Sequence, residues 1–378
     1  MSKVLFVFGT RPEAIKMAPL VIEFKNNPAI EVKVCVTGQH REMLDQVLDF
    51  FEIEPDYDLN IMKQKQSLGS ITCSILTRLD EILASFMPAH IFVHGDTTTT
   101  FAASLAAFYQ NIKVWHIEAG LRTWNMNSPF PEEGNRQLTS KLAFFHAAPT
   151  LQAKDNLLRE SVKEKNIIVT GNTVIDALLI GIKKITGSTG DVREIISLKN
   201  KLNLDKKIIL VTLHRRENQG ELLRTICDDI KQLALEHDDI EIVFPVHMSP
   251  RIREVVNEKL SGVVNIKLVE PLAYPGFIWL MNNAHFILSD SGGVQEEAPS
   301  LQKPVLVARD TTERPEVIEN GAAMLVDPRI PNNIYSSCKK LLSDERLYEK
   351  MSQAGNPFGD GKASKKILDY FVSLEDIK

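Results

Sequence analysis

Three acidic residues, each placed after a segment typical of buried structure, could carry acid–base chemistry. Asp96 and Glu118 follow the apolar runs 90–94 and 114–117, and Glu132 lies in a loop punctuated by prolines. Residues just past the carboxyl ends of strands line the ligand crevice of an open α/β sheet. Several carboxylates in one crevice favour acid and base roles, because burial and like charges push their pKa values apart. The alternative is that each residue only caps a helix or solvates a loop.

Two segments are candidates for binding a phosphate. Ser291, Gly292 and Gly293 follow an apolar run and would open a helix. Backbone N–H groups and the helix dipole favour an anion at such a position. Arg11 and Lys16 would project from the first predicted helix toward a phosphate in the crevice. The alternatives are a tight turn with a helix cap for the first segment and a solvated helix face for the two cations.

Two of the histidines occupy positions that suit a functional role. His214 ends a predicted strand and precedes two arginines, which would place a titratable group and two cations at the crevice mouth. His247 also follows a predicted strand. His94 and His116 lie inside strand patterns, where a satisfied core histidine is the expected role. No two histidines stand four residues apart on one predicted helix beside a ligand carboxylate, so the sequence gives little support to a metal site.

Composition excludes several classes of protein. With 49 acidic and 44 basic side chains the net charge is -5, which argues against an electrostatic nucleic-acid binder. No apolar run approaches the roughly 20 residues of a membrane span, and the N-terminus lacks the layout of a signal peptide. The cysteines are isolated, without a CxxC pair. We therefore expect a globular, cytoplasmic protein that has no membrane segment.

The pattern of elements predicts an α/β protein with two Rossmann-like domains. Short β-branched runs alternate with longer amphipathic stretches from the first strand at 3–8, and the alternation begins again with a new strand at 207–213. At 378 residues the chain is too long for one ordinary domain. We expect an N-terminal domain at 1–172, completed by a C-terminal helix at 360–378, and a second domain at 173–359. Neither domain has a GxGxxG after a strand, which argues against a bound dinucleotide.

Seven motifs together resemble the bacterial UDP-N-acetylglucosamine 2-epimerases. They are GTRPE at 9–13, TGQH at 37–40, HGDT at 94–97, EAGLR at 118–122, PEEGNR at 131–136, HRREN at 214–218 and DSGGVQEE at 290–297. The resemblance runs over nearly the whole chain in the family's order, so it is specific. It implies the arrangement called GT-B with the active site in the cleft between the domains, a homodimer, and interconversion of UDP-GlcNAc with UDP-ManNAc.

Chemistry explains why such a reaction needs these residue types. The C2 hydrogen is not next to a carbonyl, so simple deprotonation is very costly. Expulsion of UDP from C1 while a base takes the C2 proton leaves 2-acetamidoglucal, and UDP then adds back with protonation from the opposite face. This route needs carboxylates on both faces of the sugar and a cationic or dipolar cradle for UDP, but neither a metal nor NAD. The sequence leaves open which carboxylate serves which face.

The resemblance also implies roles for individual residues. By motif, the catalytic residues would be Asp96, Glu118, Glu132 and His214, with His214 stabilising the leaving diphosphate. Contacts to UDP and the sugar would come from Arg11, Lys16, Arg136, Leu272, Phe277, Ser291, Gly292, Gly293, Glu297 and Arg314, with uracil at Leu272 and Phe277.

Non-hydrolysing members of this family also bind a second UDP-GlcNAc as an activator beside the active site. The positions that resemble this second site are Gln39, Glu42, Lys65, Glu132, Arg215 and His247. Lys65 departs from the family, in which an arginine is common at this position. Lysine keeps the positive charge but lacks the planar guanidinium group, which can donate two parallel hydrogen bonds.

Three other functions remain open from the sequence. A hydrolysing epimerase would release free ManNAc and UDP, and the segment 39–42 together with Arg215 favours the reversible enzyme. An inverting UDP-sugar glycosyltransferase would share the fold, but it would not explain the carboxylate cluster. A non-catalytic nucleotide-sugar sensor would have no use for clustered, costly carboxylates. The pathway, whether capsule, common antigen or teichoic acid linkage, is not encoded in these motifs.

Overall fold

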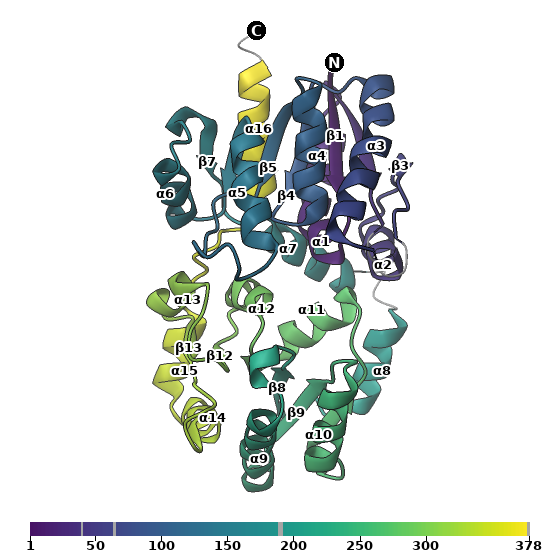
Figure 1. The fold of residues 1–378 in the computed structure, drawn as a ribbon. Coiled ribbons are helices and arrows are strands. Elements are labelled where there is room, and N and C mark those ends of the chain that lie inside the picture. Colours follow the sequence, from purple (N-terminus) through teal and green to yellow (C-terminus); the bar gives the residue numbers. More distant parts are fainter. Residues whose placement is uncertain (39–40, 63–65, 188–191, 376–378) are drawn as a thin grey trace. The chain divides into compact units, whose positions relative to one another are not determined.

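The computed structural model describes residues 1–38, 41–62, 66–187 and 192–375, which form two compact units (Figure 1). Unit 1 comprises Met1–Ile180 and Phe358–Lys378, and unit 2 comprises Gly181–Pro357. The domain boundaries expected at 172/173 and 359/360 lie close to this division and stay predictions.

Within the described residues of unit 1, seven strands form one parallel sheet in the order β3-β2-β1-β4-β5-β6-β7. The strands are β1 (Ser2–Phe8), β2 (Ile30–Val36), β3 (Tyr57–Asp58), β4 (His90–His94), β5 (Lys113–Ile117), β6 (Phe145–Ala148) and β7 (Ile167–Val169). The helices are α1 (Arg11–Lys25), α2 (Arg41–Phe51), α3 (Leu68–Phe86), α4 (Thr98–Tyr109), α5 (Glu132–Leu142), α6 (Leu151–Arg159), α7 (Thr173–Thr186), which runs across the division, and α16 (Ala363–Glu375). Helices α3, α4 and α5 cover one face of the sheet, and α1 and α16 pack on the other (Figure 1).

Aromatic side chains form the core between the sheet and α16. Phe92 stacks on Phe6 with ring centroids 4.9 Å apart and on Trp115 at 5.1 Å, and Phe371 of α16 lies 5.5 Å from Trp115. All four side chains are buried. Burial of large aromatic surface is a major stabilising contribution, so the C-terminal helix is an integral part of unit 1.

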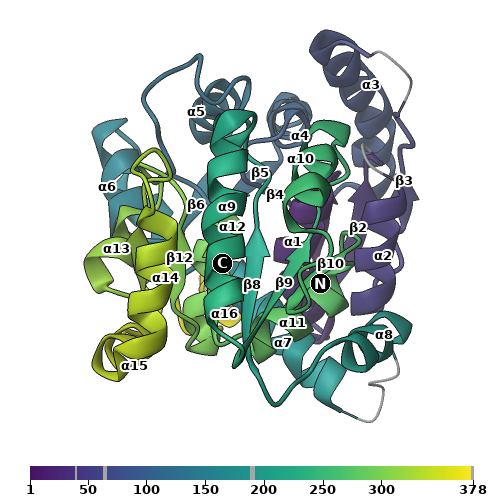
Figure 2. The same cartoon turned by 90° about the horizontal axis from the view of Figure 1, so that it is seen from below.

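Across the described part of unit 2, six strands form a second parallel sheet in the order β10-β9-β8-β11-β12-β13. The strands are β8 (Lys207–Thr212), β9 (Ile240–Pro245), β10 (Ile266–Val269), β11 (Phe286–Ser289), β12 (Val305–Val307) and β13 (Ala323–Leu325). The helices are α8 (Arg193–Lys201), α9 (Glu221–Glu236), α10 (Pro250–Leu260), α11 (Tyr274–Asn283), α12 (Gly292–Glu297), α13 (Pro315–Asn320), α14 (Asn333–Ser343) and α15 (Glu345–Ser352). Helix α9 packs against α10 and α14, as the view in Figure 2 shows.

The predicted fold class is confirmed, because both sheets are parallel and their strands are joined by helices. Two details differ from the sequence interpretation. Glu132, expected in a loop, is the first residue of α5. Strands β3 and β13 have only two and three residues, which is too short for a hydrophobic period to predict them. No helix in the described ranges combines the length and the apolar character that crossing a membrane requires.

Candidate functional site

Glu118 has a backbone conformation that side chains other than glycine rarely adopt. It follows β5 directly, and its φ is 59°, in the left-handed region. Its Oε2 accepts a hydrogen bond from Asn172 Nδ2 at 2.8 Å and forms an ion pair with Lys16 Nζ. A residue in this region costs of order 1 kcal/mol and persists only where its surroundings require it. The backbone strain therefore supports a specific role for this carboxylate.

His94 ends β4, the strand next to β5, and lies beside the same carboxylate oxygen. Its Nε2 is 3.9 Å from Glu118 Oε2, and its side chain is buried. Burial lowers the pKa of His94 to about 4, and the charge of Lys16 acts in the same direction although Glu118 opposes it. The imidazole is therefore neutral near pH 7. The sequence predicts a core histidine whose ring nitrogens are hydrogen-bonded. This is wrong for Nε2 of His94, which has no hydrogen-bond partner among the described residues.

Asp96 lies two residues after β4 and is paired with the arginine predicted to bind substrate. Its Oδ2 accepts from Arg136 Nη2, and its backbone carbonyl accepts from Asn135 Nδ2 at 2.9 Å. Although 28% of the side-chain surface is exposed, desolvation by the surrounding protein raises the pKa of Asp96. Arg136 opposes this rise, while the charges of Glu118 and Glu132 add to it. A carboxyl with a raised pKa is suited to holding a proton.

The two adjacent glutamates at the start of α5 have different surroundings. Glu133 is fully buried and accepts from the backbone N–H groups of Thr123 at 3.0 Å and Trp124 at 3.1 Å. Burial raises the pKa of Glu133, but these hydrogen bonds and Arg136 outweigh it, so the net shift is downward. Glu133 thus fixes the loop that precedes α5. Glu132 is half-buried, and its negative charge contributes to the raised pKa of Asp96.

The turn between β1 and α1 is fixed by a carboxylate that the sequence interpretation missed. Glu13 is buried, and its Oε2 accepts from the backbone N–H groups of Gly9 at 2.9 Å and Thr10 at 2.8 Å. Its Oε1 accepts from Thr97 Oγ1 at 2.6 Å, which ties the turn to the start of α4. The pattern Thr10-x-x-Glu13 is a capping box and could have been found in the sequence. This turn places Arg11, half-buried, at the first residue of α1.

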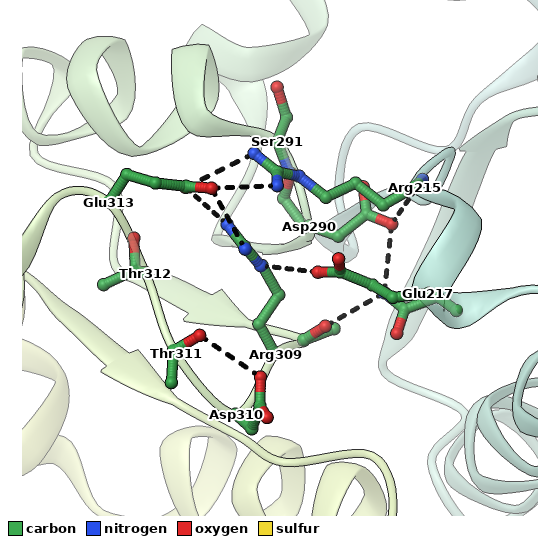
Figure 3. A network of polar contacts seen from close by, with 12 residues as sticks. Arg215, Glu217, Asp290, Ser291, Arg309, Asp310, Thr311, Thr312 and Glu313 are labelled. Atoms are coloured by element: carbon green, nitrogen blue, oxygen red, sulfur yellow. Dashed lines mark hydrogen bonds and ion pairs between the residues drawn. The ribbon is translucent and has the colours of Figure 1, made fainter. Parts of the chain in front are cut away.

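In unit 2, Asp290 organises the segment that follows β8, as Figure 3 shows in part. It is fully buried and accepts from the backbone N–H groups of His214 at 3.1 Å and Arg215 at 3.0 Å, and from Asn218 Nδ2 at 3.0 Å. His214 Nδ1 lies 3.0 Å from Asp290 Oδ1. Burial raises the pKa of Asp290, but the bonds from His214, Arg215 and Asn218 outweigh it and lower the pKa. Asp290 belongs to the motif DSGGVQEE at 290–297, but the motif alone does not predict this role.

His214 lies close to His247, which the resemblance assigns to the activator. Their ring centroids are 6.4 Å apart and the rings are nearly parallel, at 23°. The His214 side chain is 46% exposed, and its Nδ1 faces Asp290, so Nε2 is the nitrogen that a ligand can reach. The carboxylate at Nδ1 fixes the orientation of the imidazole ring. The structure therefore brings together two histidines that the sequence assigned to two ligands.

The Ser-Gly-Gly segment opens a short helix, as predicted. Ser291 is the N-cap of α12, which begins at Gly292. A Cβ at Gly292 would lie 3.2 Å from Arg314 Cζ, so glycine allows this arginine to approach closely. Arg314 Nε donates to Glu296 Oε1 at 2.8 Å, and Glu296 is buried. Glu296, which the sequence interpretation did not single out, is therefore the residue that holds the predicted UDP contact Arg314.

The remaining predicted residues are described only in part. Leu272, before α11, and Phe277, within α11, are half-buried. Glu297 is the last residue of α12 and is buried. Glu42 lies in the first turn of α2 and is exposed. Gln39 and Lys65 lie outside the described residues. Among the residues that the structure describes, no group of three or more His, Cys, Asp or Glu side chains could hold a metal ion. Ligand contacts of all these residues stay predictions.

Comparison with known proteins identifies the family. The family model described as UDP-N-acetylglucosamine 2-epimerase matches residues 22–372. The UDP-N-acetylglucosamine 2-epimerase of Escherichia coli (strain K12) is 55% identical over 367 residues, which are 97% of each chain. A crystal structure of the Neisseria meningitidis UDP-GlcNAc 2-epimerase bound to UDP-GlcNAc superposes with a TM-score of 0.89 at 52% identity, covering 98% of this chain and 100% of that one.

More distant structures extend the likeness. The Methanocaldococcus jannaschii UDP-GlcNAc 2-epimerase in complex with UDP-GlcNAc and UDP gives a TM-score of 0.79 at 34% identity, with 98% of this chain and 99% of that chain covered. Sucrose-phosphate synthase from Thermosynechococcus elongatus gives 0.65 at 12% identity over the whole of both chains. The last likeness concerns the fold alone and supports a GT-B-like class shared with glycosyltransferases.

Proposed function

This chain belongs to the UDP-N-acetylglucosamine 2-epimerase family, and on that premise we propose that it interconverts UDP-GlcNAc and UDP-ManNAc by inverting C2 of the sugar. The name of the Escherichia coli relative and the ligand in the Neisseria meningitidis structure support this substrate. The product would supply ManNAc units for a cell-surface polysaccharide. The expected homodimer and the cytoplasmic location stay predictions.

The proposed route is elimination followed by re-addition. A carboxylate takes the C2 proton while the C1–O bond to UDP breaks, and the electron pair of the C2–H bond becomes part of the C1=C2 double bond of 2-acetamidoglucal. UDP leaves with the electron pair of the C1–O bond. It then adds back to C1 while a carboxyl on the opposite face delivers a proton to C2. No hydride acceptor is needed, because the C2–H electrons stay within the sugar.

The observation that carries this proposal is the pair of dissimilar carboxyl groups in unit 1. Glu118 is held at a strained backbone position and is ion-paired with Lys16, which favours its ionised form and a role as base. Asp96 has a raised pKa, which favours a role as acid. In the reverse direction the two roles exchange. Glu132, whose charge reaches Asp96, would assist the proton transfers.

Unit 2 would provide the contacts to UDP. His214, whose Nδ1 is held by buried Asp290, would donate through Nε2 to the departing diphosphate. Its contribution would be larger in the transition state than in the ground state, since negative charge develops on the leaving group there. Arg314 and the turn at 291–293 would contact UDP, and Leu272 and Phe277 would flank the uracil.

Product analysis separates the reversible enzyme from a hydrolysing one. After incubation with UDP-GlcNAc, ¹H and ³¹P NMR should show UDP-ManNAc with an intact diphosphate linkage, in equilibrium with UDP-GlcNAc. Accumulation of free ManNAc and UDP would instead identify the hydrolysing reaction. Absence of any turnover would favour the nucleotide-sugar sensor.

We also propose that a second UDP-GlcNAc activates the enzyme. The Methanocaldococcus jannaschii enzyme, whose structure was solved in complex with both UDP-GlcNAc and UDP, is in accord with this proposal. Arg215, His247, Glu42 and Glu132, together with Gln39 and Lys65, are the residues proposed for this second position.

Activation should appear in the kinetics of both directions. The forward rate should depend sigmoidally on UDP-GlcNAc, and the reaction from pure UDP-ManNAc should stall until UDP-GlcNAc is added. The reason is that a ligand shifts a conformational equilibrium only by its differential affinity for the two states. Hyperbolic kinetics with unassisted turnover of UDP-ManNAc would remove the activator and leave the catalytic proposal in place.

A further inference from the structure

Glu313 in unit 2 joins a buried arginine to one at the surface (Figure 3). Arg309 donates to its two carboxylate oxygens at 2.6 and 3.2 Å. Arg215 donates to the same two oxygens at 3.2 and 3.4 Å. One carboxylate therefore accepts two hydrogen bonds from each of two guanidinium groups. Arg215, the arginine at the surface, is the one proposed to bind the activating nucleotide sugar.

The contact with Arg309 is the fixed part of this network. The Arg309 side chain is only 6% exposed, and its Nε donates to Glu217 Oε1 at 2.8 Å. Burial raises the pKa of Glu313, but hydrogen bonds from Arg309 and the charge of Arg215 outweigh it and lower the pKa to about 2. Glu313 is therefore ionised at any pH at which the enzyme would work, and Arg309 holds its carboxylate with two hydrogen bonds.

The contact with Arg215 is the exchangeable part. Its distances are longer, and the Arg215 and Glu313 side chains are 27% and 39% exposed. An exposed ion pair of this kind contributes little to stability. If Arg215 left, Glu313 would keep both hydrogen bonds from Arg309, and the negative charge that Arg309 does not balance would lie on the part-exposed carboxylates of Glu313 and Glu217, where water can solvate it. Arg215 can thus change partners at low cost.

The third arginine near Glu313 is not exchangeable in this way. Arg314 Nη1 is 4.0 Å from Glu313 Oε2, but Nε and Nη2 of Arg314 both contact Glu296 Oε1 at 2.8 Å. Glu296 is only 2% exposed, so this pair is held inside the protein. Among the described contacts of Glu313, Arg215 is therefore the partner that a ligand can take over.

We propose that Glu313 is an internal counter-ion that occupies Arg215 in the absence of ligand and competes with the diphosphate of the activating UDP-GlcNAc. This rests on the proposed function, which assigns Arg215 to the activator. Carboxylates and phosphates both bind a guanidinium group through two parallel hydrogen bonds. Glu313 thus raises the concentration of nucleotide sugar at which activation occurs, and the activator must displace an existing ion pair.

Glu313→Gln tests the competition directly. The substitution keeps the size of the side chain and removes the charge that holds Arg215. In the reaction started from UDP-ManNAc, the UDP-GlcNAc concentration that gives half-maximal activation should fall by about two- to five-fold, the size expected for an exposed ion pair. Measuring this concentration isolates the activator, because UDP-ManNAc is the substrate in this direction.

Two further variants make the result specific. Glu217→Gln removes the other partner of Arg309 without a contact to Arg215, so it should leave the half-activating concentration unchanged. Glu313→Asp keeps the charge on a side chain one methylene shorter, which should stay with Arg309 and withdraw from Arg215, so the half-activating concentration should again fall. Glu313→Asp carries the test if Glu313→Gln does not fold, which thermal unfolding would reveal.

The outcomes separate this inference from the function on which it rests. An unchanged or higher half-activating concentration in the folded Glu313 variants would overturn it and make Glu313 a residue that orients Arg215 for the ligand. The same fall in Glu217→Gln would also overturn it, because the effect would then come from Arg309. A wild-type enzyme that needs no UDP-GlcNAc in this direction would remove the activator itself, while epimerisation would stand.

Discussion

Glu118→Gln is expected to lower kcat by about 10²–10⁴-fold, the usual contribution of a general acid–base group, while the fold survives. Glutamine keeps the shape of the side chain at the strained position, and its carbonyl oxygen can still accept from Asn172 and Lys16. It cannot take a proton from carbon. The loss should therefore appear in kcat rather than KM, because the missing interaction belongs to the transition state.

The measurement is steady-state epimerisation by NMR together with thermal unfolding of each variant. Glu164→Gln is a suitable control, because Glu164 is also ion-paired, with Lys154 at 2.7 Å, but it is 73% exposed on the surface of unit 1. It should retain wild-type kcat. Near-normal turnover in Glu118→Gln would remove Glu118 from the catalytic set.

The sequence was sufficient to predict the sheet class and the positions of the carboxylates along it. Parallel strands buried on both faces give continuous apolar runs, and the residue after such a run must lie at the carboxyl edge of the sheet. Asp96 and Glu118 follow β4 and β5, whose register pairs His94 with Ile117. Their proximity is therefore a consequence of topology that the pattern of the sequence reveals.

The hydrogen-bond and ion-pair partners of these residues could not be predicted in the same way. The pairing of Lys16 with Glu118 joins residues 102 positions apart, and the sequence interpretation had assigned Lys16 to a phosphate. Asp290 gathers donors from residues more than 70 positions away. Such partners depend on tertiary packing, whereas the local capping box of Glu13 was visible in the sequence. The φ of Glu118 also has no local signal, since glutamate does not favour that region.

Epimerisation in deuterated water is expected to place deuterium at C2 of both epimers. In deuterated water, the C2 proton taken by a carboxylate would exchange with solvent before or between turnovers, because Asp96 and Glu118 are 28% and 10% exposed. The proton returned to C2 would then be a deuteron. Hydride transfer at C2 would not require this exchange, so the label distinguishes proton transfer from hydride transfer at this carbon.

The most direct test of the central claim is therefore the ¹H NMR spectrum of the sugar after epimerisation of UDP-GlcNAc in deuterated water. Elimination and re-addition through the carboxylates of unit 1 predict loss of the C2 proton signal, and of its coupling to C1–H, in both UDP-GlcNAc and UDP-ManNAc at equilibrium. Retention of the original hydrogen at C2 in both epimers would exclude elimination and re-addition.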